Sequence, residues 1–148
     1  YDGNKRYIPD FLIRTSEGLA FIIEIKFRKQ LADCEVLRKA EAASIFLGKK
    51  GVGYCLVDED GFSVKDMKTV PVAEGLKLFL RTKLRTQGFI NFKDLYDFFD
   101  GPPNDTVFDQ LQSLALNYPE KIRYTTKLEH TGDIKNPFKF DFWFGLAK

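Results

Sequence analysis

The sequence predicts an α/β sheet followed by a small α+β module. In the first half, apolar stretches typical of strands lie on both sides of a helical pattern, and a helix between two strands favours a parallel crossover. In the second half, three helical patterns precede two stretches of alternating polarity. The 148 residues suffice for one ordinary domain or two small ones. We therefore expect one module over residues 1–66 and another over residues 72–148.

The N-terminal residues predict two turns and two strands. Residues 2–6 have the composition of a hairpin turn, and residues 7–14 would form the returning strand. A second turn at residues 15–18 leads into a nearly continuous apolar strand over residues 19–27. Such continuity implies burial on both faces. Because Tyr1 stands directly before a predicted turn, we expect the first module to be truncated at its N-terminus.

A helix and a further strand complete the first module. Asp33 is a suitable N-cap for a helix that runs to about Leu47. Residues 52–57 form a short apolar strand, and residues 66–71 have the composition of a linker. The two cysteines, Cys34 and Cys55, lie in apolar-periodic segments, so we expect buried thiols in a reducing cytoplasm.

The second half predicts three helices and a β-hairpin. The elements are a helix over residues 72–88, a helix capped by Asn91 and ending at Phe99, a helix capped by Asn104 and ending near Asn117, and strands over residues 121–130 and 138–145. Three helices followed by a hairpin form the outline of a winged helix. The third helix contains Asp105 and Asp109 but no Lys or Arg, which departs from the usual pattern of a DNA-reading helix. The module therefore binds protein, or it contacts DNA through its hairpin.

Three charged residues of the first module indicate a metal-dependent site. Glu24 and Lys26 share one face of their strand, because side chains alternate in a strand. The turn at residues 15–18 brings Asp10 beside them on the neighbouring strand. Two carboxylates, together with the carbonyl of Ile25, are oxygen ligands that suit Mg²⁺. The alternative is that Glu24 and Lys26 merely pair on a half-exposed strand. We favour the functional interpretation, because two charges within an apolar strand are costly without partners or a task.

The same residues carry a resemblance to a known family. Pro9-Asp10, a turn, an apolar strand and Glu24-Ile25-Lys26 resemble the PD-(D/E)xK nuclease superfamily over roughly residues 1–57. The resemblance implies a restriction-endonuclease-like mixed sheet and hydrolysis of DNA phosphodiester bonds. It also implies that Asp10 and Glu24 bind Mg²⁺, for which Mn²⁺ can substitute, and that Lys26 is the catalytic lysine. Many members use a further acidic residue on an upstream helix, which this sequence lacks.

Within the superfamily, the phrases Tyr-Ile-Pro-Asp-Phe-Leu-Ile and Ile-Ile-Glu-Ile-Lys resemble TnsA-type transposon endonucleases. This likeness implies the cleavage subunit of a transposition complex, with DNA as substrate and a transposase subunit bound through the C-terminal module. Restriction endonuclease subunits are the second family, because they share the motif and a following helix rich in Lys and Ala, as in residues 39–43. A third alternative is an inactive nuclease fold that serves as a DNA- or protein-binding adaptor.

Basic residues outside the motif are candidates for contacts with the DNA backbone. The net charge is only +2, so this interpretation depends on local clusters and competes with that of ordinary solvated faces. The candidates are Arg28, Lys29, Lys77, Arg81, Arg85, Lys121, Arg123 and Lys127. Trp143 is expected beside the last three of them.

Composition excludes several function classes. His130 is the only histidine, which nearly excludes His-based metal sites and Ser/His/Asp hydrolysis. No apolar run is long enough to span a membrane, and no signal peptide is visible. We therefore expect a cytoplasmic protein that does not act at a membrane.

Overall fold

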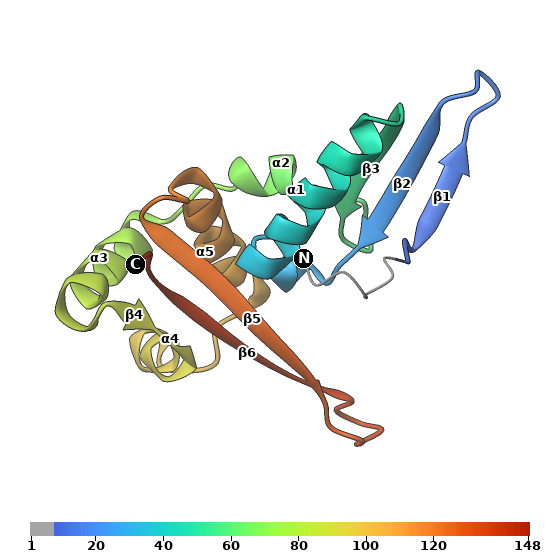
Figure 1. Cartoon of the computed structure of the whole chain (residues 1–148). Helices are drawn as coiled ribbons and strands as arrows, with labels where there is room; N and C mark the ends of the chain where they lie inside the picture. The colour runs from blue at the N-terminus through green and yellow to red at the C-terminus, as the bar shows by residue number, and fades with distance from the viewer. Residues whose placement is uncertain (1–7) are drawn as a thin grey trace.

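The computed structural model describes residues 8–148 (Figure 1). The predicted turn at residues 2–6 and the strand end at Tyr1 lie outside the described residues. Of the returning strand predicted over residues 7–14, the structure shows β1 over Phe11–Arg14. The described chain contains two three-stranded sheets, with helices packed between and beside them.

The first sheet is mixed, as the sequence predicts. Its strands are β1 (Phe11–Arg14), β2 (Ala20–Ile25) and β3 (Val52–Val57), in that spatial order. β1 and β2 are antiparallel across a turn in which the Gly18 N–H donates to the Thr15 carbonyl, and β2 and β3 are parallel. The crossover is α1 (Cys34–Gly48), capped by Asp33 and packed against one face of the sheet.

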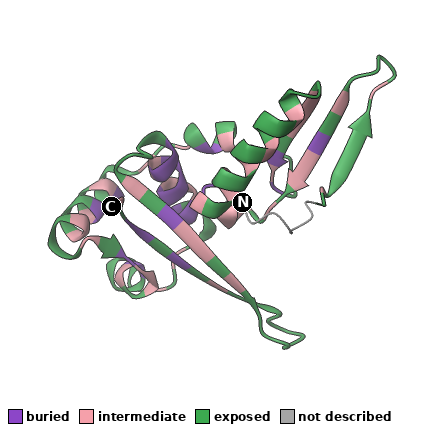
Figure 2. Ribbon diagram, in the orientation of Figure 1, coloured by how far each residue is buried: buried purple, intermediate pink, exposed green. Residues whose placement is uncertain are grey.

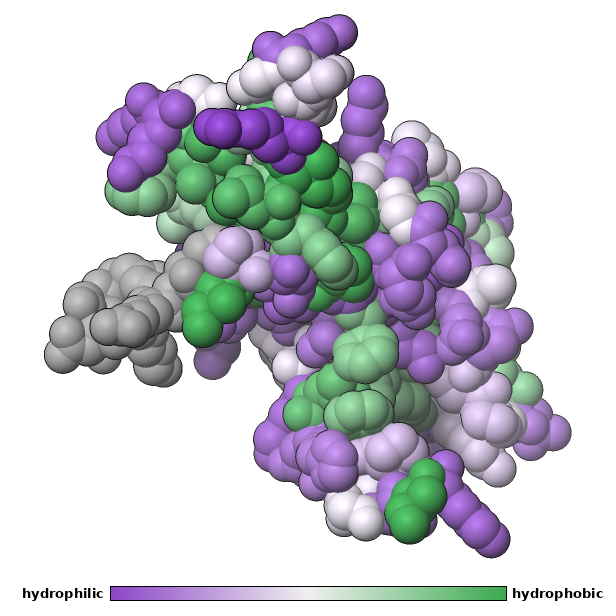
Figure 3. Space-filling model, turned by 90° about the vertical axis from the view of Figure 1, so that its right-hand side faces the viewer, coloured by the Kyte–Doolittle hydropathy of each residue, from purple (hydrophilic) through white to green (hydrophobic). Residues whose placement is uncertain are grey.

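The prediction that the second strand is buried on both faces is wrong. Within β2 only Ile22 is buried, whereas Phe21 and Ile25 on the opposite face are 39% and 37% exposed. No described segment covers that face, and Figure 3 shows hydrophobic side chains gathered at the surface in the upper part of its view. Cys55 lies on this open face, because it pairs with Ile23 in register. Its thiol is therefore exposed rather than buried.

Cys34, by contrast, is half-buried at the start of α1. Burial, followed by the negative charges of Asp33 and Glu35, raises the pKa of its thiol. The expectation of a buried thiol is therefore met only in part and only at this cysteine.

The predicted linker over residues 66–71 is partly helical. A short helix, α2 (Val64–Lys68), begins at a capping box in which Ser63 and Asp66 exchange hydrogen bonds. Met67 of this helix is completely buried. The Ser-x-x-Asp spacing was the signal for this helix, and burial of Met67 holds it against the rest of the molecule.

The second half contains the predicted helices and hairpin, with one additional short strand. The helices are α3 (Glu74–Gln87), α4 (Phe92–Phe99) and α5 (Asp105–Asn117), and the strands are β4 (Phe89–Ile90), β5 (Ile122–His130) and β6 (Phe138–Leu146). Asn91 and Asn104 cap α4 and α5 as predicted. β4 pairs with β6, so the second sheet has the order β4-β6-β5.

One hydrophobic cluster joins both halves of the described chain. It contains Leu31 and Leu56 of the first half together with Leu111 and Phe144 of the second. The helix α5 lies between the halves and contacts α2, β5 and the 3₁₀ turn η1 (Arg28–Gln30). Figure 2 shows how much of α5 is buried. The division into modules at residues 1–66 and 72–148 stays a prediction.

Candidate active site

The first sheet brings Asp10 to the strand that carries Glu24 and Lys26. Asp10 directly precedes β1, whose first residue Phe11 pairs with Ile23. The Asp10 Oδ2 atom accepts a hydrogen bond of 2.8 Å from the backbone N–H of Ile25. The side chain of Asp10 is thus anchored between the positions of Glu24 and Lys26.

Glu24 and Lys26 form an ion pair. The Lys26 Nζ and Glu24 Oε1 atoms are 2.7 Å apart, and the two side chains are 34% and 13% exposed. The sequence left open that Glu24 and Lys26 merely pair with each other, and this ion pair does exist in the structure. The Glu24 carboxylate is, however, largely shielded from water. A carboxylate of this kind can bind a cation, and an ammonium can bind a phosphate.

The donor atoms fit a hard divalent cation. Mg²⁺ is usually held by one or two carboxylates together with water and substrate phosphate, and Asp10 and Glu24 supply two carboxylates. Among residues 8–148, no group of three or more His, Cys, Asp or Glu side chains could hold a metal ion. Asp10 and Glu24 are the residues whose oxygen atoms would hold such a cation.

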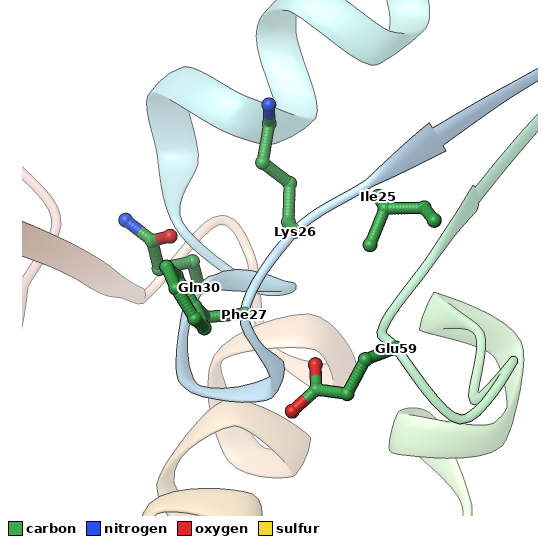
Figure 4. A pocket seen from close by; sticks show the side chains of 5 residues that line it. All are labelled: Ile25, Lys26, Phe27, Gln30 and Glu59. Atoms are coloured by element: carbon green, nitrogen blue, oxygen red, sulfur yellow. The ribbon is translucent and has the colours of Figure 1, made fainter. Parts of the chain in front are cut away.

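A cavity of about 420 Å³ lies beside the end of β2. It is lined by Ile25, Lys26, Phe27, Gln30 and Glu59 (Figure 4). The side chain of Lys26 extends away from that of Glu59 in Figure 4, so the ammonium does not point toward this carboxylate. Sequence reasoning did not single out Glu59 or Gln30. Glu59 could have been found, because it follows β3, and parallel neighbours such as β2 and β3 end at the same edge of a sheet.

Arg28, two residues after Lys26, is engaged in an internal ion-pair network. Its Nε atom lies 3.1 and 3.2 Å from the two carboxylate oxygens of Asp109, and its Nη1 atom lies 3.4 Å from Oδ2 of the fully buried Asp58. The guanidinium also stacks 3.7 Å from the ring centre of Phe62. The hydrogen bond to Asp109 is the main reason that the pKa of Arg28 is raised. Lys29 similarly pairs with Asp105 at 2.9 Å. DNA contact by Arg28 and Lys29 stays a prediction.

The backbone that follows this network is held by the second half of the chain. The buried side chain of Gln112 donates to the Arg28 carbonyl at 3.0 Å and accepts from the Ala32 N–H at 2.9 Å. The Tyr124 hydroxyl donates to the Lys29 carbonyl at 2.7 Å. The sequence analysis assigned no internal role to Gln112. The position of Gln112 among the buried residues of α5 was the signal for such a role.

Asp33 provides the third link between the halves. Its Oδ1 atom caps α1 by accepting from the N–H groups of Glu35 and Val36. Its Oδ2 atom accepts from the N–H and the hydroxyl of Thr126 in β5, at 2.6 and 2.8 Å. The segment that follows Glu24 and Lys26 is therefore positioned by α5 and β5.

The remaining basic candidates fall into two groups on the second half. Lys77, Arg81 and Arg85 of α3 line a groove together with Lys121, and α3 lies at the opposite end of the molecule from β1 (Figure 1). Lys127 pairs with Glu129. Trp143 lies opposite Thr125, between Arg123 and Lys127 on the neighbouring strand, as expected. None of these residues is brought to the site of Asp10, and their contact with DNA stays a prediction.

None of the helices in the described part of the chain is both long and apolar enough to cross a membrane.

No curated protein and no solved structure matches the chain. A family model does match its N-terminal part: residues 1–59 match the family described as "TnsA-like endonuclease N terminal". The matched region contains β1 and β2 together with Asp10, Glu24 and Lys26. This match confirms the resemblance predicted from the motif, and it is consistent with a TnsA-type PD-(D/E)xK nuclease-like protein.

Proposed function

We propose that the protein is a metal-dependent DNA endonuclease that hydrolyses phosphodiester bonds as the cleavage subunit of a transposition complex. The observation that carries the proposal is the convergence of Asp10, Glu24 and Lys26 at one end of the first sheet. The match of residues 1–59 to TnsA-like endonucleases supports the same activity.

Each residue of the site has a distinct part in this reaction. Asp10 and Glu24 would hold Mg²⁺ or Mn²⁺, with the carbonyl of Ile25 as a further ligand. The metal, when bound, polarises the scissile phosphate and lowers the pKa of a water molecule. Lys26 would release Glu24 to the metal and place its ammonium against the charge that develops on the phosphate.

The second half supports a role in assembly. The order helix, short strand, helix, helix and hairpin, with β4 paired to β6, agrees with a winged-helix-like module. In such modules the third helix usually reads DNA. Here that helix, α5, buries Leu111, Gln112 and Leu116 among other residues and packs against the first half. We therefore propose that this module recruits a partner protein, such as a transposase subunit, and does not read bases with α5.

Two alternatives remain from the sequence. A restriction endonuclease subunit would cut at a fixed recognition sequence without a transposase partner. An inactive adaptor would use the Glu24–Lys26 pair only as a surface ion pair and would not bind metal. The internal anchoring of Asp10 on Ile25 N–H favours an organised site over a surface pair.

The proposal is tested by titrating Mg²⁺ or Mn²⁺ into the full chain, with calorimetry and plasmid nicking measured in parallel. We expect binding that disappears in the Asp10→Ala/Glu24→Ala double variant and persists in the matched double variant Glu17→Ala/Glu41→Ala, which removes two exposed carboxylates. Lys26→Ala should abolish nicking while leaving the thermal unfolding midpoint near that of the wild type. Absence of metal binding in the wild type, or its persistence in the Asp10/Glu24 variant, would refute the proposed site whether or not cleavage requires a partner.

A further inference from the structure

A groove on the second half lies between α3, the end of α5 and the ends of β5 and β6. Its volume is about 630 Å³. Its lining residues come from α3, α5, β5, β6 and the loop after α5. The groove is therefore a product of the tertiary fold and not of one helix face.

The groove combines an apolar floor with a basic rim. Leu80 and Phe144 at the floor are 2% and 0% exposed, whereas Tyr118 and Leu146 are 52% and 46% exposed. Exposed apolar side chains of this size beside a hydrophobic groove mark a surface that gains from being covered. All four charged side chains that line the groove are cations.

The arrangement of the cations is regular. Lys77, Arg81 and Arg85 stand four residues apart along α3, so they form one row along the groove. Lys121 lines the groove from the loop that precedes β5. Lys77 is paired with Glu74 at 2.9 Å, so Arg81, Arg85 and Lys121 carry most of the positive charge that this surface offers to a partner.

We propose that this groove binds an acidic amphipathic helix of a partner protein. A helix of this kind inserts apolar side chains, spaced three or four residues apart, into a hydrophobic groove. Glu and Asp residues on its flanks would pair with Arg81, Arg85 and Lys121. The cations of the groove favour an acidic segment, and the exposed apolar side chains of Tyr118 and Leu146 favour an amphipathic one. This inference specifies the partner-binding part of the proposed function.

Duplex DNA fits this surface less well. Phosphates require cations, but they gain nothing from burying Tyr118 or Leu146. A peptide helix uses both properties of the groove, because buried apolar anchors at the centre and charged pairs at the rim are typical of such interfaces. Peptide binding and DNA binding can therefore be distinguished, because only peptide binding depends on the apolar side chains of Tyr118 and Leu146.

The test begins with a display library of helical peptides of about four turns, selected on the immobilised full chain. We expect enrichment of acidic peptides with an apolar stripe. The dissociation constant of a synthetic enriched peptide is then measured by fluorescence anisotropy. Arg81→Glu/Arg85→Glu should weaken binding at least about tenfold, and Tyr118→Ser/Leu146→Asn should do the same through loss of apolar anchors. Lys49→Glu/Lys50→Glu, an equal charge reversal at the remote end of α1, should leave the affinity within about twofold.

Several results would overturn the inference. Failure to enrich acidic amphipathic peptides is one. If polyglutamate bound as tightly as the enriched peptide, or if the Tyr118→Ser/Leu146→Asn variant kept the full affinity for that peptide, the groove would be a surface that binds any polyanion. Duplex DNA that binds with the same dependence on Arg81 and Arg85, and that displaces the peptide, would assign the surface to DNA. None of these measurements needs metal or Asp10, so failure of the peptide test is separable from failure of the nuclease proposal.

Discussion

Replacing Asp33 with alanine should lower the free energy of unfolding by about 3–5 kcal/mol, because this carboxylate has two structural roles. Its Oδ1 atom caps α1, and its Oδ2 atom accepts two hydrogen bonds from Thr126 across the boundary between the halves. Asp33 is only 5% exposed, so water cannot easily replace the lost acceptor.

The magnitude follows from these contacts. Loss of an N-cap costs about 1 kcal/mol. The N–H and the hydroxyl of Thr126 each lose a charged, buried acceptor, and each loss lowers the free energy of unfolding by roughly a further 1–2 kcal/mol. This value lies toward the lower end of the range for such groups because Thr126 itself is only half-buried. Asp33→Asn should cost less, about 2–3 kcal/mol, because an asparagine oxygen still caps the helix while its NH₂ group faces the Thr126 donors.

The assay is urea unfolding followed by circular dichroism, with the slope m compared between variants. Ser63→Ala is the matched control, since it removes the N-cap of α2 without breaking a contact between the halves. It should cost about 1 kcal/mol. If Asp33→Ala costs no more than Ser63→Ala, the bonds to Thr126 do not stabilise the fold and the reasoning fails.

Three further outcomes are expected. Arg28→Met should cost about 2–3 kcal/mol in urea unfolding, because it leaves the fully buried Asp58 without its cation; a loss below about 0.5 kcal/mol, as for a surface pair, would contradict this. Burial acts to raise the pKa of Asp94, but its hydrogen bonds outweigh that effect and the pKa is lowered. A lowered pKa stabilises the fold above the unfolded-state value near 3.9, and this stability is lost as pH falls through the folded-state pKa. The free energy of unfolding of Asp94→Asn should therefore fall less steeply below about pH 4 than that of the wild type. An equally steep fall in the variant would contradict this expectation. Tyr124→Phe removes the bond to the Lys29 carbonyl and should cost about 1 kcal/mol. Because burial raises the pKa of Tyr124, its stabilising effect is complete below the unfolded-state pKa near 10 and declines as pH rises toward the folded-state pKa. Urea unfolding at about pH 8 and about pH 11 should show a smaller decline in the Phe variant than in the wild type.

The residues of the proposed site could be chosen from the sequence because the pattern that links them is local. Asp10 directly precedes β1 and Glu24 lies in β2, and a short turn joins these two strands. Strand alternation predicts that Glu24 and Lys26 share a face. The parallel crossover through α1 was predictable for a similar reason, since a capped amphipathic helix separates two apolar strands.

The burial of β2 and the environment of Cys55 were predicted wrongly. An apolar strand shows that a side chain can be buried, but not that another segment covers it. Phe21 and Ile25 are apolar and yet more than a third exposed, because no described segment packs on their face.

The sequence by itself determined most of the helices and strands, the caps Asp33, Asn91 and Asn104, and the three charged residues of the proposed site. Helix and strand periodicity and capping act over a few residues, so a local pattern can specify them. Only the tertiary structure decided that Arg28, Asp33 and Gln112 join the two halves, and that Arg81 and Leu146 line the same groove. Arg28 is separated from its partner Asp109, and Gln112 from its partner Ala32, by about 80 residues of sequence. Contacts over such separations depend on the packing of whole elements, which no local pattern of residues specifies.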